Sequence, residues 1–334
     1  MTQAPFTPTD PEGGLILATR LPGGARLGWD DLVTPNEPPP VWIHLDRTKE
    51  RAKRWVSDAA GLDPLAVHSL LAEETRPRVQ RFDTGERSGV VVILRGVNLN
   101  EGAEPDELIA IRLWVEPTRV ISLRQFRFGT IAELRERADR GQAPTTAGAF
   151  LAGVVMGLAS RMDPVVTNLH GLLDTIEESM IDRDSDQPAW RAQLADVRRQ
   201  AITLRRYLAP QRDSLLSLAI DPPGFLTKRD AAEIRVAAEQ IARVVDALEE
   251  TRDRAAVTQD ELRARHEARL SRTLYLLTIV ATVALPLGLL TGLLGINVGG
   301  IPLADSHWGF VIICVLLVGI AAVEVLIFKA MRWL

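Results

Sequence analysis

Two long apolar runs constrain the fold of this chain more than any other feature. They cover residues 274–294 and 308–328, and the only charged side chain in either run is that of Glu324. An apolar helix of about twenty residues matches the hydrocarbon thickness of a bilayer, roughly 30 Å. The sequence therefore predicts two transmembrane helices that follow a large soluble portion. Because two helices cannot enclose a conduit, any passage through the membrane would require an oligomer.

Basic residues flanking the two runs predict the orientation. They lie before the first run and after the second, as Arg263, Arg265, Arg269, Arg272, Lys329 and Arg332, and the connecting segment 295–307 has no Lys or Arg. Cytoplasmic flanks carry the excess of positive charge, so both termini and the basic tail 329–334 are expected inside. The start of the chain has no basic segment followed by an apolar stretch, so we expect no signal peptide. Cys314, the only cysteine, lies inside the second run, which excludes disulfides within the chain.

Residues 1–144 have the pattern of a cytoplasmic α/β domain. Short β-branched and apolar runs bounded by turn residues predict strands. Asp63-Pro64 supplies a helix cap and a first helical residue. The pattern predicts strands at 14–20, 41–45, 90–99, 108–115 and 119–124, and helices at 46–60, 64–72 and 129–140.

After Pro144 only helical signals remain. Residues 145–224 are expected to form a helical hairpin of two helices, 145–181 and 188–220. A capping-box-like pair, Thr227 and Asp230, then opens an uninterrupted pattern from 228 to 294. Its part at 225–273 is a predicted stalk helix, which continues into the first transmembrane helix at 274–294.

The stalk carries a seven-residue apolar repeat. The repeat begins apolar and becomes small and polar toward the membrane, at Ile234, Ala237, Ile241, Val244, Leu248, Thr251, Ala255, Thr258 and Leu262. A dimeric coiled coil would normally keep Leu or Ile along its length. We expect the first half to pack on the helical hairpin of its own chain. For the second half, a ring of helices widening around water is at least as compatible with the pattern.

Small and polar residues mark one side of the first transmembrane helix. Gly288 and Gly292 form a GxxxG pattern, which is typical of close helix packing and is also compatible with a pore-lining face. Thr278 and Thr282 are expected to satisfy their hydroxyl groups on backbone carbonyls. Pro286 removes a backbone donor and is expected to bend the helix.

The segment Gly295-Ile296-Asn297 follows directly. An Asn amide oxygen accepts hydrogen bonds from water bound to a cation, so a ring of such residues suits a hydrated ion. An Asn after a glycine is also an ordinary helix C-cap.

The complete pattern resembles the CorA family of divalent-cation transporters. The resemblance rests on two closing spans, a long helix entering the first span, and Pro286 ahead of a Gly-x-Asn motif. The family signature is Gly-Met-Asn, and Gly295-Ile296-Asn297 followed by Val298-Gly299-Gly300 looks like its ZntB branch, which is associated with zinc. Further segments similar to that branch are Trp42-Ile43-His44-Leu45-Asp46, Glu73-Glu74-Thr75-Arg76-Pro77-Arg78, Leu94-Arg95-Gly96-Val97-Asn98-Leu99 and Arg112-Leu113-Trp114.

This resemblance implies a CorA-like homopentameric funnel in the cell inner membrane, with the first span of each subunit lining a central pore. Matched by position, the pore face would carry Leu274, Leu277, Ala281, Leu285, Gly288 and Asn297. Ile296 replaces the usual Met, and Leu303 stands where magnesium-type members carry a Glu in the external loop 295–307. Both departures fit the zinc branch. That branch is thought to couple metal entry to protons, and the coupling residues are not evident in this chain.

Several other polar residues are weaker candidates. Intramembrane Glu324 suits a proton-coupling group, although Lys329 and Arg272 are near enough in depth to pair with it. Asp305 and His307 could attract a cation outside, and Gly299 and Gly300 complete the loop motif. Asp260 is a candidate acidic ring on the stalk.

The sequence therefore predicts a zinc transporter with no enzyme activity and no cofactor. Hydrated Zn²⁺ would pass inward, with or without proton coupling, and Leu277 and Leu285 would gate by dewetting. Mg²⁺, Co²⁺, Ni²⁺ and Cd²⁺ are alternative ions, and a magnesium or cobalt channel is the first alternative function. A membrane-anchored cytoplasmic scaffold or sensor is the second. The expected partners are further copies of the chain, lipid, divalent cations and protons, and no nucleic acid.

Overall fold

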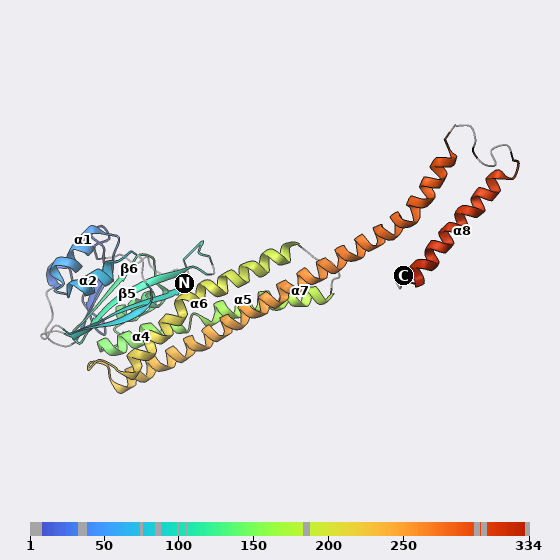
Figure 1. The fold of residues 1–334 in the computed structure, drawn as a ribbon. Coiled ribbons are helices and arrows are strands. Elements are labelled where there is room, and N and C mark those ends of the chain that lie inside the picture. Colours follow the sequence, from blue (N-terminus) through green and yellow to red (C-terminus); the bar gives the residue numbers. More distant parts are fainter. Residues whose placement is uncertain are drawn as a thin grey trace. The chain divides into compact units, whose positions relative to one another are not determined.

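The computed structural model describes residues 9–32, 39–73, 76–83, 88–98, 100–104, 106–182, 188–296, 301 and 306–330. The chain divides into two compact units, Met1–Gln259 and Asp260–Leu334. Helix α7 (Lys228–Leu294) begins in the first unit and ends in the second. The mixed α/β domain, the long helix and the apolar C-terminal helices confirm the predicted fold class (Figure 1).

A six-stranded sheet in the order β1-β2-β6-β5-β4-β3 forms the centre of the first unit. Strands β2 and β6 are parallel and the other neighbours are antiparallel. The strands are β1 (Leu15–Arg20), β2 (Val41–Asp46), β3 (Arg78–Asp83), β4 (Ser88–Val97), β5 (Leu108–Glu116) and β6 (Arg119–Arg124). Five of them correspond to predicted strands. The sixth, β3, was not predicted. It lies at the edge of the sheet, where its side chains are half-buried or exposed, so its sequence has no clear apolar face.

One face of the sheet is covered by α1 (Glu50–Arg54), the π-helix η2 (Trp55–Ala59) and α2 (Pro64–Leu71). Side chains from these helices and from the odd-numbered positions of β2 and β6 form a continuous buried core. The Asp63 side chain accepts a hydrogen bond from the Leu65 backbone at 2.8 Å, so the predicted cap of α2 is confirmed. The predicted helix at 46–60 begins later, at Glu50, because the Asp46 carboxylate is bonded to Thr48 instead.

The opposite face is covered by α4 (Ala147–Ala159), with α3 (Gly129–Asp139) beside it. Trp42 and Phe150 have ring centroids 4.8 Å apart, which joins β2 to α4. Trp42 Nε1 donates a buried hydrogen bond to the Ser122 hydroxyl at 2.8 Å, and His44 Nδ1 lies 2.8 Å from the same hydroxyl. Burial of the His44 ring, above all, lowers its pKa to about 3.

The helical part contains α5 (Asp163–Asp182), α6 (Pro188–Ile220) and α7, which lie side by side (Figure 1). The prediction of one helix over 145–181 is wrong, since α4 ends at Ala159 and α5 starts at Asp163. The Asp163-Pro164 pair explains the break, because proline favours the first turn of a new helix. The capping box of α7 is confirmed: Thr227 N lies 2.9 Å from Asp230 Oδ2, and Asp230 N lies 3.1 Å from Thr227 Oγ1.

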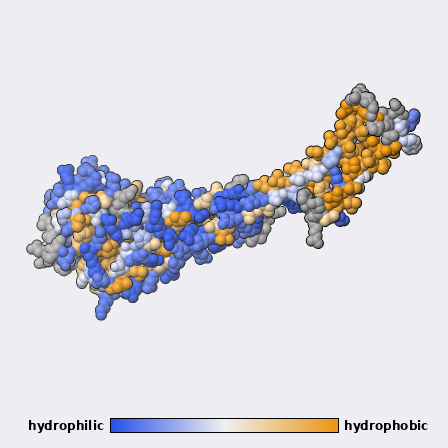
Figure 2. Space-filling model, viewed as in Figure 1, coloured by the Kyte–Doolittle hydropathy of each residue, from blue (hydrophilic) through white to orange (hydrophobic). Residues whose placement is uncertain are grey.

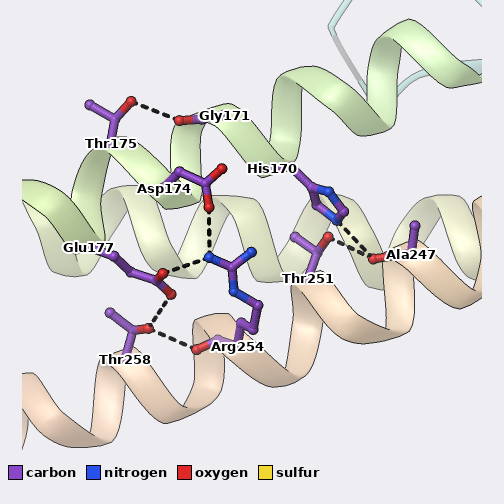
Figure 3. Close-up of polar contacts among 9 residues, drawn as sticks. All are labelled: His170, Gly171, Asp174, Thr175, Glu177, Ala247, Thr251, Arg254 and Thr258. Atoms are coloured by element: carbon purple, nitrogen blue, oxygen red, sulfur yellow. Dashed lines mark hydrogen bonds and ion pairs between the residues drawn. The ribbon is translucent and has the colours of Figure 1, made fainter.

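The seven-residue repeat of α7 faces the interior of its own unit. All its members from Ile234 to Thr258 are buried. Thr251 donates to the Ala247 carbonyl at 2.7 Å, and Thr258 donates to Glu177 of α5 at 3.0 Å (Figure 3). The alternative of a water-facing ring in the second half of the repeat is therefore wrong for Thr251 and Thr258.

Candidate ion pathway

Three segments are long and apolar enough to cross a membrane by length and composition. The first, Ala147–Met180, has half of its most apolar window buried inside the first unit, where α4 packs on the sheet. The most apolar windows of α7 and of α8 (Gly309–Ala330) are 0% buried. Figure 2 shows their apolar side chains gathered over the end of α7 and over α8. The described chain leaves these two surfaces uncovered, so they suit contact with lipid and with further copies of the chain.

The described residues of the predicted pore face form one narrow arc on α7. At about 100° per residue, these five positions fall within roughly 80° of the helix circumference. All are exposed, with Leu274 at 63%, Leu277 at 61% and Leu285 at 70%. Ala281 and Gly288 separate the leucines with small side chains. Such an arc can line a conduit in which leucines narrow the path and small residues leave room.

The GxxxG pattern has no packing partner within the described chain. A Cβ atom added at Gly288 or Gly292 would meet no atom within 4 Å. Gly292 follows Leu285 by two helical turns and therefore lies on the same arc. The pore face matched by position did not include Gly292, although the GxxxG pattern already offered Gly292 as a pore-lining alternative.

Hydroxyl groups in this part of α7 bond to the helix itself. Thr278 donates to the Leu274 carbonyl at 2.8 Å, and Thr282 donates to the Thr278 carbonyl at 2.7 Å. The structural role expected for both threonines is confirmed. Pro286 lies inside α7, which continues to Leu294.

The Gly-Ile-Asn motif begins where α7 ends. The Gly295 backbone N–H donates to the carbonyls of Thr291 and Gly292, at 3.0 and 3.2 Å. The Ile296 side chain is 47% exposed, and His307 is also exposed. The remaining predicted residues of the loop, Asn297, Gly299, Gly300 and Asp305, lie outside the described residues, as does Leu303.

The weaker acidic candidates have different surroundings. Asp260 Oδ1 lies 3.4 Å from Arg263 Nη1, and both side chains are largely exposed. Glu324 has a buried Oε2 atom that has no hydrogen-bond partner among the described residues. Within the described part of the chain, Glu324 forms no ion pair with Lys329 or Arg272. Over the same residues, no group of three or more His, Cys, Asp or Glu could hold a metal ion.

The fold and the exposed apolar helices define a membrane transporter class in which a soluble α/β unit precedes the membrane helices. The family described as "CorA-like Mg2+ transporter protein" matches residues 39–330, and the chain belongs to this family. It is therefore a divalent-cation transporter of the CorA family.

Several relatives are similar over nearly their whole length. The "Divalent cation transporter CmaX" of Pseudomonas aeruginosa is 38% identical over 97% of this chain and 98% of its own. The "Zinc transport protein ZntB" of Pectobacterium carotovorum subsp. carotovorum is 30% identical over 96% of both chains. The solved structure of full-length CmaX matches with a TM-score of 0.83 and 37% identity, over 97% of this chain and 100% of that one. CorA of Methanocaldococcus jannaschii has a TM-score of 0.77 at 17% identity, over 95% of this chain and 98% of that one, which shows the shared fold.

Proposed function

We propose that the chain is a zinc transporter that assembles as a homopentamer in the cell inner membrane. In this assignment residues 274–294 and 308–328 span the bilayer, residues 295–307 form the external loop, and both termini are cytoplasmic. The observation that carries the proposal is the exposed arc from Leu274 to Gly288, which is left uncovered by the described chain. Several copies of this arc around one axis would enclose a pore.

The ion would enter hydrated and move inward. The side chain of Asn297 would accept hydrogen bonds from metal-bound water, and leucines of the arc would narrow the pore below it. Zinc is favoured by the similarity to relatives named zinc transport proteins and by the Gly-Ile-Asn motif. The intramembrane carboxylate of Glu324, whose Oε2 atom has no partner in the described part of the chain, suits a proton-coupling group.

The test is ion flux into liposomes that contain the purified full-length protein. Zn²⁺ should enter, and an imposed pH gradient should change its rate if protons are coupled. Mg²⁺ flux without Zn²⁺ flux would instead assign the alternative function of a magnesium or cobalt channel. Chemical crosslinking of the same sample should give a pentamer.

A single substitution separates transport from the scaffold alternative. Asn297→Ala should abolish Zn²⁺ flux while the oligomer remains assembled, because only the ion-binding amide is removed. Ser306→Ala in the same external loop is the matched control and should retain most of the flux. Undiminished flux in Asn297→Ala would contradict the proposed site.

A further inference from the structure

The part of α7 that precedes its apolar run has its arginines concentrated on one side. Arg265, Arg269 and Arg272 are spaced by four and then three residues, so they share one face of the helix. At about 100° per residue, the middle of this face lies roughly 150° from the middle of the exposed arc that begins at Leu274. All three arginines are exposed. We call these three residues the arginine face.

The carboxylates of this part of α7 are distributed differently. Of the three between residues 260 and 273, Asp260 and Glu267 lie on the side of the arc. The third, Glu261, is next to the arginine face, and its Oε1 lies 2.5 Å from Nη2 of Arg265. Helix α7 has no Asp or Glu after Glu267. The arginine face therefore becomes more positive toward the apolar run.

Two members of the arginine face lie at the depth of lipid headgroups, a step that rests on the proposed span of residues 274–294. At 1.5 Å per residue, Arg272 and Arg269 come about 3 and 8 Å before this span. The headgroup layer on one side of a bilayer is about 6 Å thick, and a long arginine side chain can extend along it. Tyr275, which is 40% exposed, is a residue type enriched at this interface. Arg265 is about 14 Å away and acts at longer range.

The headgroup of an anionic phospholipid matches the chemistry of this face. Planar guanidinium groups bind phosphate oxygens in pairs. A basic residue next to an anionic membrane surface strengthens binding by about fivefold. A free phosphate ion would meet only solvated charges on one helix, which salt screens. A lipid instead brings its phosphate to the depth of Arg269 and Arg272, because its acyl chains hold it in the bilayer.

We propose that Arg269 and Arg272, with Arg265 at longer range, bind headgroups of anionic phospholipids at the cytoplasmic surface of the membrane. The contact is on the side of α7 that faces away from the proposed pore. It holds the start of the first span at one depth and makes the protein select anionic over zwitterionic lipid.

Lipid retention by the full-length protein tests this selection. The protein is reconstituted into vesicles of phosphatidylglycerol and phosphatidylcholine, in equal amounts and with the same acyl chains. It is then extracted in a mild nonionic detergent, and the lipids that remain bound are counted by mass spectrometry. We expect phosphatidylglycerol to exceed phosphatidylcholine by about fivefold or more, and the excess to shrink in high salt. Arg269→Gln and Arg272→Gln should each lower this ratio several-fold.

Arg263→Gln is the matched control. It removes the same charge from the same helix, but Arg263 lies on the side of the arc, 3.4 Å from Asp260. The lipid ratio of this variant should stay near that of the unmodified protein. Equal retention of the two lipids by the unmodified protein, or equal losses in Arg263→Gln and Arg269→Gln, would overturn the proposal. Displacement of the lipid by inorganic phosphate, but not by chloride at equal ionic strength, would assign a free-anion site and would also overturn it.

The proposed function is measured separately on the same vesicles. Resistance of the protein to alkaline carbonate extraction reports insertion into the membrane, and Zn²⁺ flux reports the pore. Inserted protein that conducts Zn²⁺ without lipid selection would contradict the lipid contact alone. Lipid selection without Zn²⁺ flux would support the lipid contact and contradict the proposed transport.

Discussion

Arg254 Nη2 of α7 lies 2.6 Å from Glu177 Oε2 of α5, and this contact joins the long helix to the helix beside it (Figure 3). The same guanidinium lies 2.7 Å from Asp174 Oδ1, and the Thr258 hydroxyl donates to the second oxygen of Glu177. The hydrogen bonds that Arg254 donates, first to Asp174 and then to Glu177, raise the pKa of Arg254. Linked charges of this kind contribute more than an isolated surface pair.

We predict that Glu177→Gln lowers the stability of the helical part. The loss should be about 1 kcal/mol, because the bonds are charge-assisted but only partly buried. The measurement is the unfolding midpoint of the full-length protein in detergent, in low salt and in 1 M salt. The neighbouring Glu178→Gln is the control, since Glu178 is exposed and makes no such bond with any described residue. If both variants unfold at the same midpoint, the contact does not stabilise the helix pair.

The buried His44 predicts a loss of stability in acid. Its pKa is about 3 in the folded chain, against an ordinary value of 6.5. The unfolded chain therefore binds a proton between these values and the folded chain does not. The contribution of His44 to the free energy of unfolding is fully present above pH 6.5. It is lost as the pH drops toward 3, by up to about 1.4 kcal/mol per pH unit.

His44→Phe removes this titration while keeping a ring in the core. The fall in unfolding midpoint between pH 7 and pH 5 should be smaller in the variant than in the unmodified protein. His170→Phe is the control, because His170 is partly exposed on α5. An unchanged pH dependence in His44→Phe would show that other groups cause the acid sensitivity.

Helix α7 and most of the sheet could be predicted because their signals are local. The capping box at Thr227 and Asp230 and the absence of helix breakers define the start and length of α7. The break between α4 and α5 was not predicted, because apolar residues continue on both sides of Asp163-Pro164 and resemble one continuous helix. The π-helix at Trp55–Ala59 has no sequence pattern of its own and follows from packing on the core.

Residues that are close on one helix could be predicted from the sequence, and residues brought together by strand pairing could not. The exposed arc of α7 follows from helical spacing, so its residues could be proposed in advance. The proximity of Arg78, Arg95 and Arg112 could not be predicted, because these residues are brought together only by the register of β3, β4 and β5. Each lies in a segment that carries the family resemblance, but strand β3 has no clear pattern in the sequence.

The arc of α7 makes a prediction about gating that adjacent leucines can test. Leu277 lies on the arc and is 61% exposed, and Leu276 lies off it and is 55% exposed. A narrowing of leucines excludes water and therefore ions, so Leu277→Ser should wet it and raise basal Zn²⁺ flux several-fold in liposomes. Leu276→Ser should leave the flux near that of the unmodified protein, because its side chain faces away from the proposed axis. Equal changes in the two variants, with equal amounts of assembled protein, would mean that this side of α7 does not line the pore.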